Sequence, residues 1–84
     1  MLPTALRTGD LWFYVGGDVD QPARPTVRVR RGSAEATLSI PTGEVTRTEG
    51  FCSRDLRRIR SLVRDHRRLL MLAWEDYARR SPVR

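Results

Sequence analysis

The sequence predicts an α+β fold, in which a small antiparallel β-sheet, built as a meander or hairpin, packs against one long C-terminal α-helix. Two observations lead to this prediction. Apolar and polar residues alternate ahead of residue 40, and from Phe51 onward apolar residues recur every three or four positions. A chain of 84 residues has room for a single domain. We expect residues 1–40 to form the sheet, 41–52 a connecting loop and 53–80 an amphipathic helix.

The first expected strand is "LWFYV", residues 11–15, because aromatic and β-branched side chains favour extended structure. It is apolar at every position, so we expect it to be central in the sheet or covered on both faces. Glycine, aspartate and proline mark the following stretch, "GGDVDQPARP", as a loop. Pro25 restricts Arg24 to extended conformations and so leads into the next strand.

A β-hairpin is expected over residues 26–40, where two alternating runs flank Gly32 and Ser33. Glycine suits the first position of a type II′ turn. Pairing outward from that turn sets Arg31 opposite Ala34, Arg30 opposite Glu35, Val29 opposite Ala36, Arg28 opposite Thr37, Val27 opposite Leu38 and Thr26 opposite Ser39. One face then collects the valines with Ala36 and Leu38. A slip of one residue would destroy that separation, which specifies the register.

The expected helix carries an apolar stripe on one face. Its members are Leu56, Ile59, Val63, His66, Leu70, Ala73 and Tyr77, widened by Leu62, Leu69 and Trp74. We expect either Cys52 or Ser53 to be the N-cap. In both cases the carboxylate of Asp55 lies near the positive end of the helix dipole, which stabilises the helix. A straight helix of this length would measure about 40 Å, longer than so small a sheet can cover. We therefore expect it to bend, or one end to pack on something else.

The composition is that of a soluble cytoplasmic protein. The chain shows no apolar run of membrane-spanning length and no signal peptide, and its single cysteine fits a reducing compartment. One cysteine and one histidine make a metal site improbable, and we expect no cofactor. The net charge of +6 is carried entirely by arginine, since there is no lysine. Either arginine codon bias or a need for the planar guanidinium accounts for this.

Several motifs stand in a familiar order: "GF", "DLRRI", "LV", "H", "LL" and "AWEDY" between Gly50 and Tyr77, after "RPTVRV" in the hairpin. The chain resembles domain-of-unknown-function family 4160, whose small bacterial members often lie beside a second small gene in toxin–antitoxin-like arrangements. The resemblance implies a compact sheet-plus-helix protein with a protein partner. Thr26 and Arg28 stand where relatives carry histidines, so a metal or proton-transfer role of those histidines is not expected here. Cys52 replaces a cap serine.

Two arginine-rich surfaces are candidate contacts for nucleic acid or an acidic partner. The first lies on and before the hairpin, and the second follows one flank of the helix. Their members are Arg24, Arg28, Arg30 and Arg31, and then Arg57, Arg60, Arg64 and Arg68. The alternative for the hairpin arginines is a solvated outer face, with Arg30 and Glu35 as a cross-strand pair.

No catalytic residue is expected. His66 falls on the apolar stripe, where a structural histidine that hydrogen bonds to a sheet or loop group is the favoured interpretation. Cys52 lies too far along a straight helix to form a dyad with it. Cys52 near Arg54 has two interpretations, a reactive thiol and a simple replacement of serine at the cap, and we favour the second.

The run "LLMLAW" is apolar nearly all the way round the helix, and one small sheet covers only one side of it. We therefore expect Leu69, Met71 and Leu72 to form a protein interface, unless the N-terminal "LPTAL" folds over that side. The expected function is a non-enzymatic interaction module in a toxin–antitoxin-like pair, binding a neighbouring-gene product or a second copy. The alternatives are a nucleic-acid-binding protein and, less favoured, a nuclease-like toxin, which would lack a general base.

Overall fold

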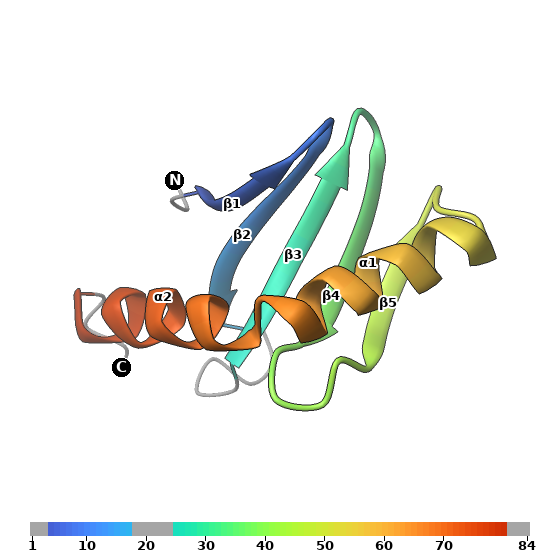
Figure 1. The fold of residues 1–84 in the computed structure, drawn as a ribbon. Coiled ribbons are helices and arrows are strands. Elements are labelled where there is room, and N and C mark those ends of the chain that lie inside the picture. The colour runs from blue at the N-terminus through green and yellow to red at the C-terminus, as the bar shows by residue number, and fades with distance from the viewer. Residues whose placement is uncertain (1–3, 18–24, 81–84) are drawn as a thin grey trace.

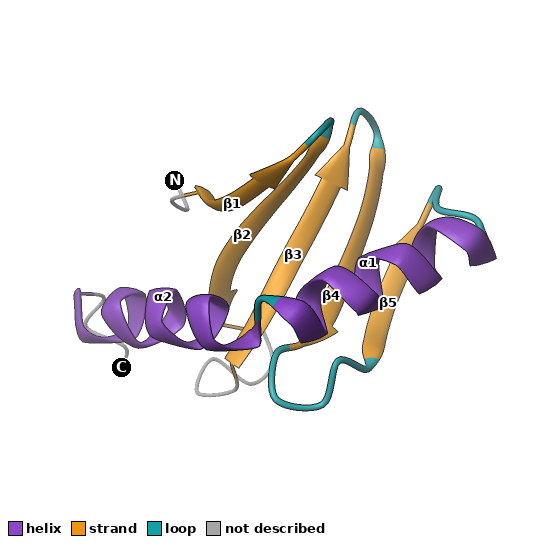
Figure 2. Ribbon diagram, viewed as in Figure 1, coloured by secondary structure: helices purple, strands orange, loops and turns teal. Residues whose placement is uncertain are grey.

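The protein forms two layers, a five-stranded antiparallel sheet and a pair of helices on one of its faces (Figures 1 and 2). The structure is a computed structural model that describes residues 4–17 and 25–80. The strands follow one another as a meander, so each pairs with its neighbour in the chain. Their bounds are β1 Thr4–Thr8, β2 Leu11–Gly17, β3 Pro25–Arg31, β4 Ala34–Ser39 and β5 Val45–Glu49, and the helices are α1 Ser53–Asp65 and α2 Arg67–Arg80.

The β3–β4 hairpin has the register predicted from the sequence at all six residue pairs, from Thr26 opposite Ser39 to Arg31 opposite Ala34. Gly32 has a φ of +61°, and Ser33 does not have a positive φ, as a type II′ turn requires. The alternation is visible in the burial of the hairpin: Val27 and Leu38 are fully buried, whereas Arg30 is exposed. Binary patterning therefore determined which face of this hairpin turned inward.

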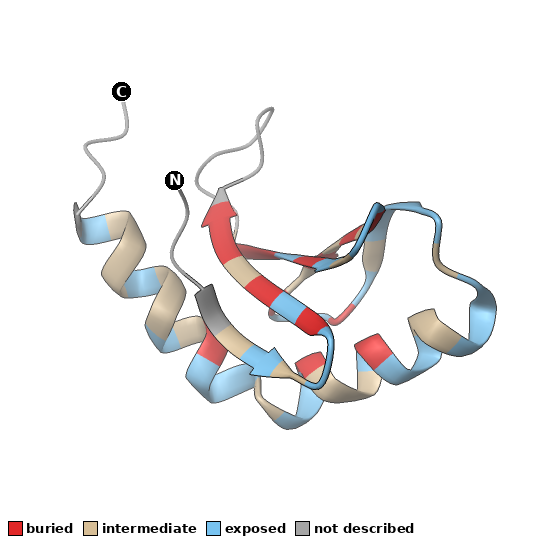
Figure 3. Ribbon diagram, turned by 90° about the horizontal axis from the view of Figure 1, so that it is seen from above, coloured by how far each residue is buried: buried red, intermediate tan, exposed pale blue. Residues whose placement is uncertain are grey.

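The hydrophobic core lies between the inner face of the sheet and the helices (Figure 3). The strands contribute alternate residues, and the helices contribute one side chain per turn. Fully buried core residues are Phe13, Val27, Val29, Leu38 and Ile40 from the sheet side, and Ile59, Val63 and Leu70 from the helices. Leu56, Leu62, Ala73, Trp74 and Tyr77 pack partly buried at the margin.

The prediction of one long helix is wrong, because the helix is broken at His66 into α1 and α2. His66 has φ −110° and ψ +21°, outside the helical range. Its Nδ1 lies 2.9 Å from the carbonyl oxygen of Leu62, which also accepts the backbone N–H of His66 at 3.0 Å. The ring thus shares a helix carbonyl with the backbone at the point where the helix bends. The expectation that the helix bends is thus confirmed, and the bend lets both halves cover the sheet (Figure 1).

The two edge strands were not identified individually from the sequence, although β1 lies within residues 1–40, which we expected to form the sheet. The segment 41–52, expected to be a connecting loop, contains β5, which pairs with β4. The N-terminal segment provides β1, which pairs with β2 and lies beside α2. β2 is an interior strand, but it is covered on one face only: Phe13 is fully buried, whereas Trp12 is 36% exposed on the other side.

Gly50, directly after β5, should tolerate alanine worse than Gly9 does. Gly9 has a φ of +62° with open space around its Cα, so alanine there costs only the left-handed backbone, about 1–2 kcal/mol. At Gly50, with a φ of +90°, a new Cβ would also lie 3.1 Å from Cα and Cβ of Ala34. We expect Gly50→Ala to lower the free energy of unfolding in urea by more than Gly9→Ala does. Equal losses would show that the close approach to Ala34 is relieved at no cost.

Candidate functional site

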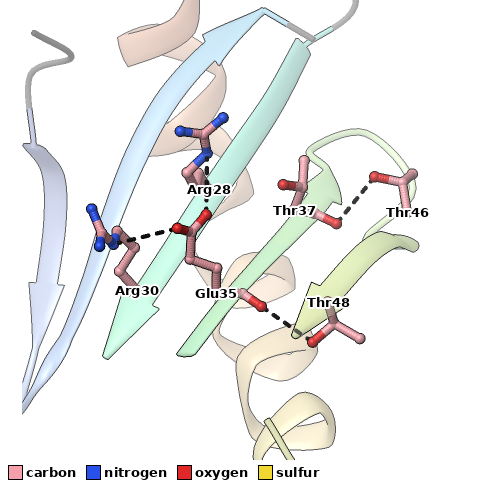
Figure 4. Close-up of polar contacts among 6 residues, drawn as sticks. All are labelled: Arg28, Arg30, Glu35, Thr37, Thr46 and Thr48. Carbon is pink, nitrogen blue, oxygen red and sulfur yellow. Dashed lines mark hydrogen bonds and ion pairs between the residues drawn. The ribbon is translucent and has the colours of Figure 1, made fainter. Parts of the chain in front are cut away.

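The hairpin arginines Arg28 and Arg30 share one carboxylate on the outer face of the sheet (Figure 4). Their Nε atoms lie 3.9 and 3.8 Å from the two carboxylate oxygens of Glu35. All three side chains are about half exposed, so each pair is weak and screened by salt. This arrangement matches the solvated face with a cross-strand pair that the sequence offered as an alternative.

The side chain of Arg31 contacts the start of α1. Its Nη2 donates a 2.8 Å hydrogen bond to Asp55 in the first turn of α1, and its guanidinium lies 5.3 Å from the centre of the Phe51 ring. The hydrogen bond from Arg31, followed by contacts with Cys52, lowers the pKa of Asp55 below its usual value of 3.8. Arg31 thus ties the end of β3 to the start of α1. Arg24, the remaining member of this predicted surface, lies outside the described residues.

The helix arginines Arg57, Arg60 and Arg64 lie together along one flank of α1. They line a depression of about 260 Å³ between α1 and the loop that joins β4 to β5. The fourth arginine of the lining is Arg67, at the start of α2, whereas the sequence predicted Arg68 as the fourth member of this row. The predicted row assumed one continuous helix, whereas the chain forms α1 and α2 on either side of His66. Within residues 4–17 and 25–80, none of these four arginines forms an ion pair.

His66 and Cys52 occupy separate structural positions. The ring of His66 is bound to the Leu62 carbonyl, a group of its own helix rather than the sheet or loop group that we expected. Cys52 is exposed and is the N-cap of α1, but its side chain makes no capping hydrogen bond. Of the two N-cap candidates, Cys52 is therefore the one observed, and its backbone rather than its thiol forms the helix start.

An apolar patch lies on α2. Leu69 is 45% exposed and Leu72 is 56% exposed, and the two side chains are neighbours at a spacing of three residues. Met71, the third residue of the predicted interface, is only partly exposed because it packs against the core. β1 lies beside α2 and leaves both leucines exposed. Trp12 is a further exposed apolar side chain that the sequence analysis did not single out, and the guanidinium of Arg7 lies 4.4 Å from its ring centre.

The outer edge between β4 and β5 is bound by side-chain hydrogen bonds. Thr46 and Thr48 on β5 donate their hydroxyls to the carbonyl oxygens of Thr37 and Glu35, at 3.2 and 3.3 Å (Figure 4). Beside them lies a shallow depression lined by both acidic and basic side chains. Because the lining carries both signs of charge, it favours neither an anionic nor a cationic ligand. The threonine spacing in "VTRTE" is the sequence signal that marks this strand.

Neither a metal centre nor a membrane-spanning helix is found among the described residues. Nowhere in ranges 4–17 and 25–80 do three or more His, Cys, Asp or Glu side chains gather as metal ligands would. None of the described helices has the length and hydropathy needed to cross a membrane.

Comparison with known proteins gives one match. A family model described as "Domain of unknown function (DUF4160)" matches residues 12–75, from β2 into α2. No curated protein and no solved structure matches the chain. The matched segment includes the hairpin, the bend at His66 and the apolar patch on α2.

The Arg31–Asp55 contact should make Asp55→Asn more harmful near neutral pH than in acid. Because the folded state lowers the pKa of Asp55, its contribution is fully present above about pH 4 and is lost as the pH falls through the folded value. We expect the difference in melting temperature between the native chain and the variant to shrink as the pH is lowered from about 7 to about 2. Asp65→Asn is the matched control, because Asp65 forms no ion pair within the described part of the chain. A difference that is constant over this pH range would contradict the assignment.

Proposed function

This chain belongs to the DUF4160 family, and we propose that it is a small non-enzymatic protein-interaction module, one component of a toxin–antitoxin-like pair. The observation that carries the proposal is the pair of exposed leucines, Leu69 and Leu72, on α2. The toxin–antitoxin part is supported by the resemblance, which implies a second small protein encoded beside the first.

The position of this patch favours a docking role over a packing role. α2 already buries Leu70 completely and Met71 partly against the sheet, so Leu69 and Leu72 extend the apolar surface beyond what the core uses. Burying a leucine completely stabilises an assembly by about 1.5–3 kcal/mol, and these two side chains still have about half of that area to bury. A partner that covers them gains this free energy in addition to any polar contacts.

The charge of the surroundings indicates what kind of partner fits. Arg68 directly precedes Leu69, lies four residues before Leu72 and is exposed, and the chain carries a net charge of +6. A complementary partner would present an apolar groove with an acidic rim, because opposite charges at the rim of an interface speed association. We take the product of the neighbouring gene as the occupant, and a second copy of this chain as the competing outcome.

We propose a non-enzymatic role because the candidate nucleophile, Cys52, and the candidate base, His66, lie apart. His66 is bound to the Leu62 carbonyl at a helix bend, and Cys52 is at the far end of α1. A general base must reach its proton donor within hydrogen-bond distance, and α1 separates these two groups.

Replacing both leucines by glutamate should weaken the interaction. We expect the native chain to co-purify with the co-expressed product of the neighbouring gene, and Leu69→Glu with Leu72→Glu to weaken the affinity by about tenfold or more, because charge replaces apolar contact at the centre of the interface. Calorimetric titration measures the affinity, and light scattering measures the mass of each species.

The matched control is Trp12→Gln, which removes an exposed apolar side chain on the opposite face of the sheet. It should bind as the native chain does. A native chain that remains a monomer with its neighbour present would contradict the proposal. A homodimer that the double variant dissociates would replace the partner by a second copy.

A further inference from the structure

We propose that the depression between α1 and the β4–β5 loop binds consecutive phosphate groups of a nucleic-acid backbone. This site is separate from the apolar patch of the proposed function, and neither depends on the other. Its lining is made of cationic and hydroxyl side chains and one glycine, namely Thr42, Gly43, Arg57, Arg60, Ser61, Arg64 and Arg67.

Among the residues that the structure describes, the arginines of this depression have no carboxylate partner, in contrast to Arg28, Arg30 and Arg31 of the hairpin. Arg28, Arg30 and Arg31 each lie within 4 Å of a carboxylate oxygen. Within the described part of the chain no acidic side chain lines the depression, although Glu44 and Asp65 are sequence neighbours of two of its lining residues. Four guanidinium groups gathered around one hollow repel one another, and a bound anion relieves that repulsion.

The wall formed by the β4–β5 loop is held in place by its own hydrogen bonds. The backbone N–H of Gly43 donates to the carbonyl of Ser39 at 2.7 Å, and the backbone N–H of Ser39 donates to the carbonyl of Glu44 at 2.9 Å. The backbone N–H of Glu44 donates to the hydroxyl of Thr42 at 3.2 Å. A wall that is already ordered needs little further ordering when a ligand binds.

The dimensions favour a ligand with more than one anionic group. Arg57 and Arg64 are seven residues apart on α1, which corresponds to about 10 Å along the helix axis. A nucleic-acid strand carries one phosphate per nucleotide, so a row of this length faces more than one phosphate at once. Arginine offers each of them a planar pair of donors.

The chemistry of the lining also distinguishes a nucleic-acid backbone from an acidic protein. In ranges 4–17 and 25–80 no large apolar or aromatic residue lines the depression, whereas the energetic centre of a protein interface is made of such residues. The same lack of aromatic groups leaves no platform on which bases stack. The contacts are therefore to phosphates, and binding should depend little on base sequence.

The test is fluorescence anisotropy of labelled single-stranded RNA and duplex DNA, each about 20 residues long, at about 50 and 200 mM salt. The variant is Arg60→Gln with Arg64→Gln. The matched control is Arg28→Gln with Arg30→Gln, which removes the same charge from the outer face of the sheet. All these arginines are exposed, and melting temperatures verify that both variants remain folded.

We expect the native chain to bind both oligonucleotides, and the Arg60/Arg64 variant to bind at least about tenfold more weakly at low salt. Its slope of log affinity against log salt on duplex DNA should be smaller by about 1.8, since each phosphate contact contributes about 0.9. The Arg28/Arg30 control should stay within about threefold of the native affinity.

Three outcomes would overturn the proposal. Equal weakening in both variants would mean that net charge alone drives binding. No binding by the native chain at low salt would remove the nucleic-acid ligand, even if inorganic phosphate raised its melting temperature. Equal displacement of the oligonucleotide by polyglutamate of matched length would show that the depression does not distinguish phosphate from carboxylate. None of these results bears on capture of a protein partner through Leu69 and Leu72.

Discussion

Burial of the single apolar face of the sheet under a bent helix is the interaction on which the rest of the structure depends. An open meander of five strands leaves one apolar face, and Ile59, Val63 and Leu70 cover it from two helices at different angles. The bend at His66 makes this coverage possible, because one straight helix would extend past so small a sheet. The same bend places the apolar patch on α2 and the arginine row on α1.

The positions of a few carboxylates determine which arginines form ion pairs within the fold. Glu35 lies between Arg28 and Arg30, and Asp55 holds Arg31 against the start of α1. Those three arginines therefore contribute to the sheet surface and to its connection with the helix. Along the flank of α1 that faces the β4–β5 loop, no carboxylate of the described residues lines the depression. The charge of the chain is thus divided between structural cations and a row that is available to a ligand.

The sequence predicted those features that depend on local periodicity and missed those that depend on tertiary contacts. The strict alternation around Gly32 determined the hairpin register, and the spacing of Ile59 and Val63 determined the buried stripe of α1. The break at His66 carries neither glycine nor proline, the usual sequence signals of a helix kink, so it could not be predicted from the sequence. β5 consists of "VTRTE", with little apolar alternation, and is defined by its pairing with β4. The spacing of the helix arginines predicted that they share one flank of the helix. It did not predict that the β4–β5 loop lies opposite them.

The central claim is that carboxylate placement leaves the α1 arginines, and not those of the hairpin, free to bind phosphate. The most direct measurement is a two-dimensional NMR spectrum of the arginine Nε–Hε groups, recorded while a short oligonucleotide is added to the labelled native chain. We expect the signals of Arg57, Arg60 and Arg64 to shift in a saturable manner while those of Arg28 and Arg31 stay in place. Larger shifts at the hairpin arginines than at the α1 row, or uniform shifts at both, would contradict this claim.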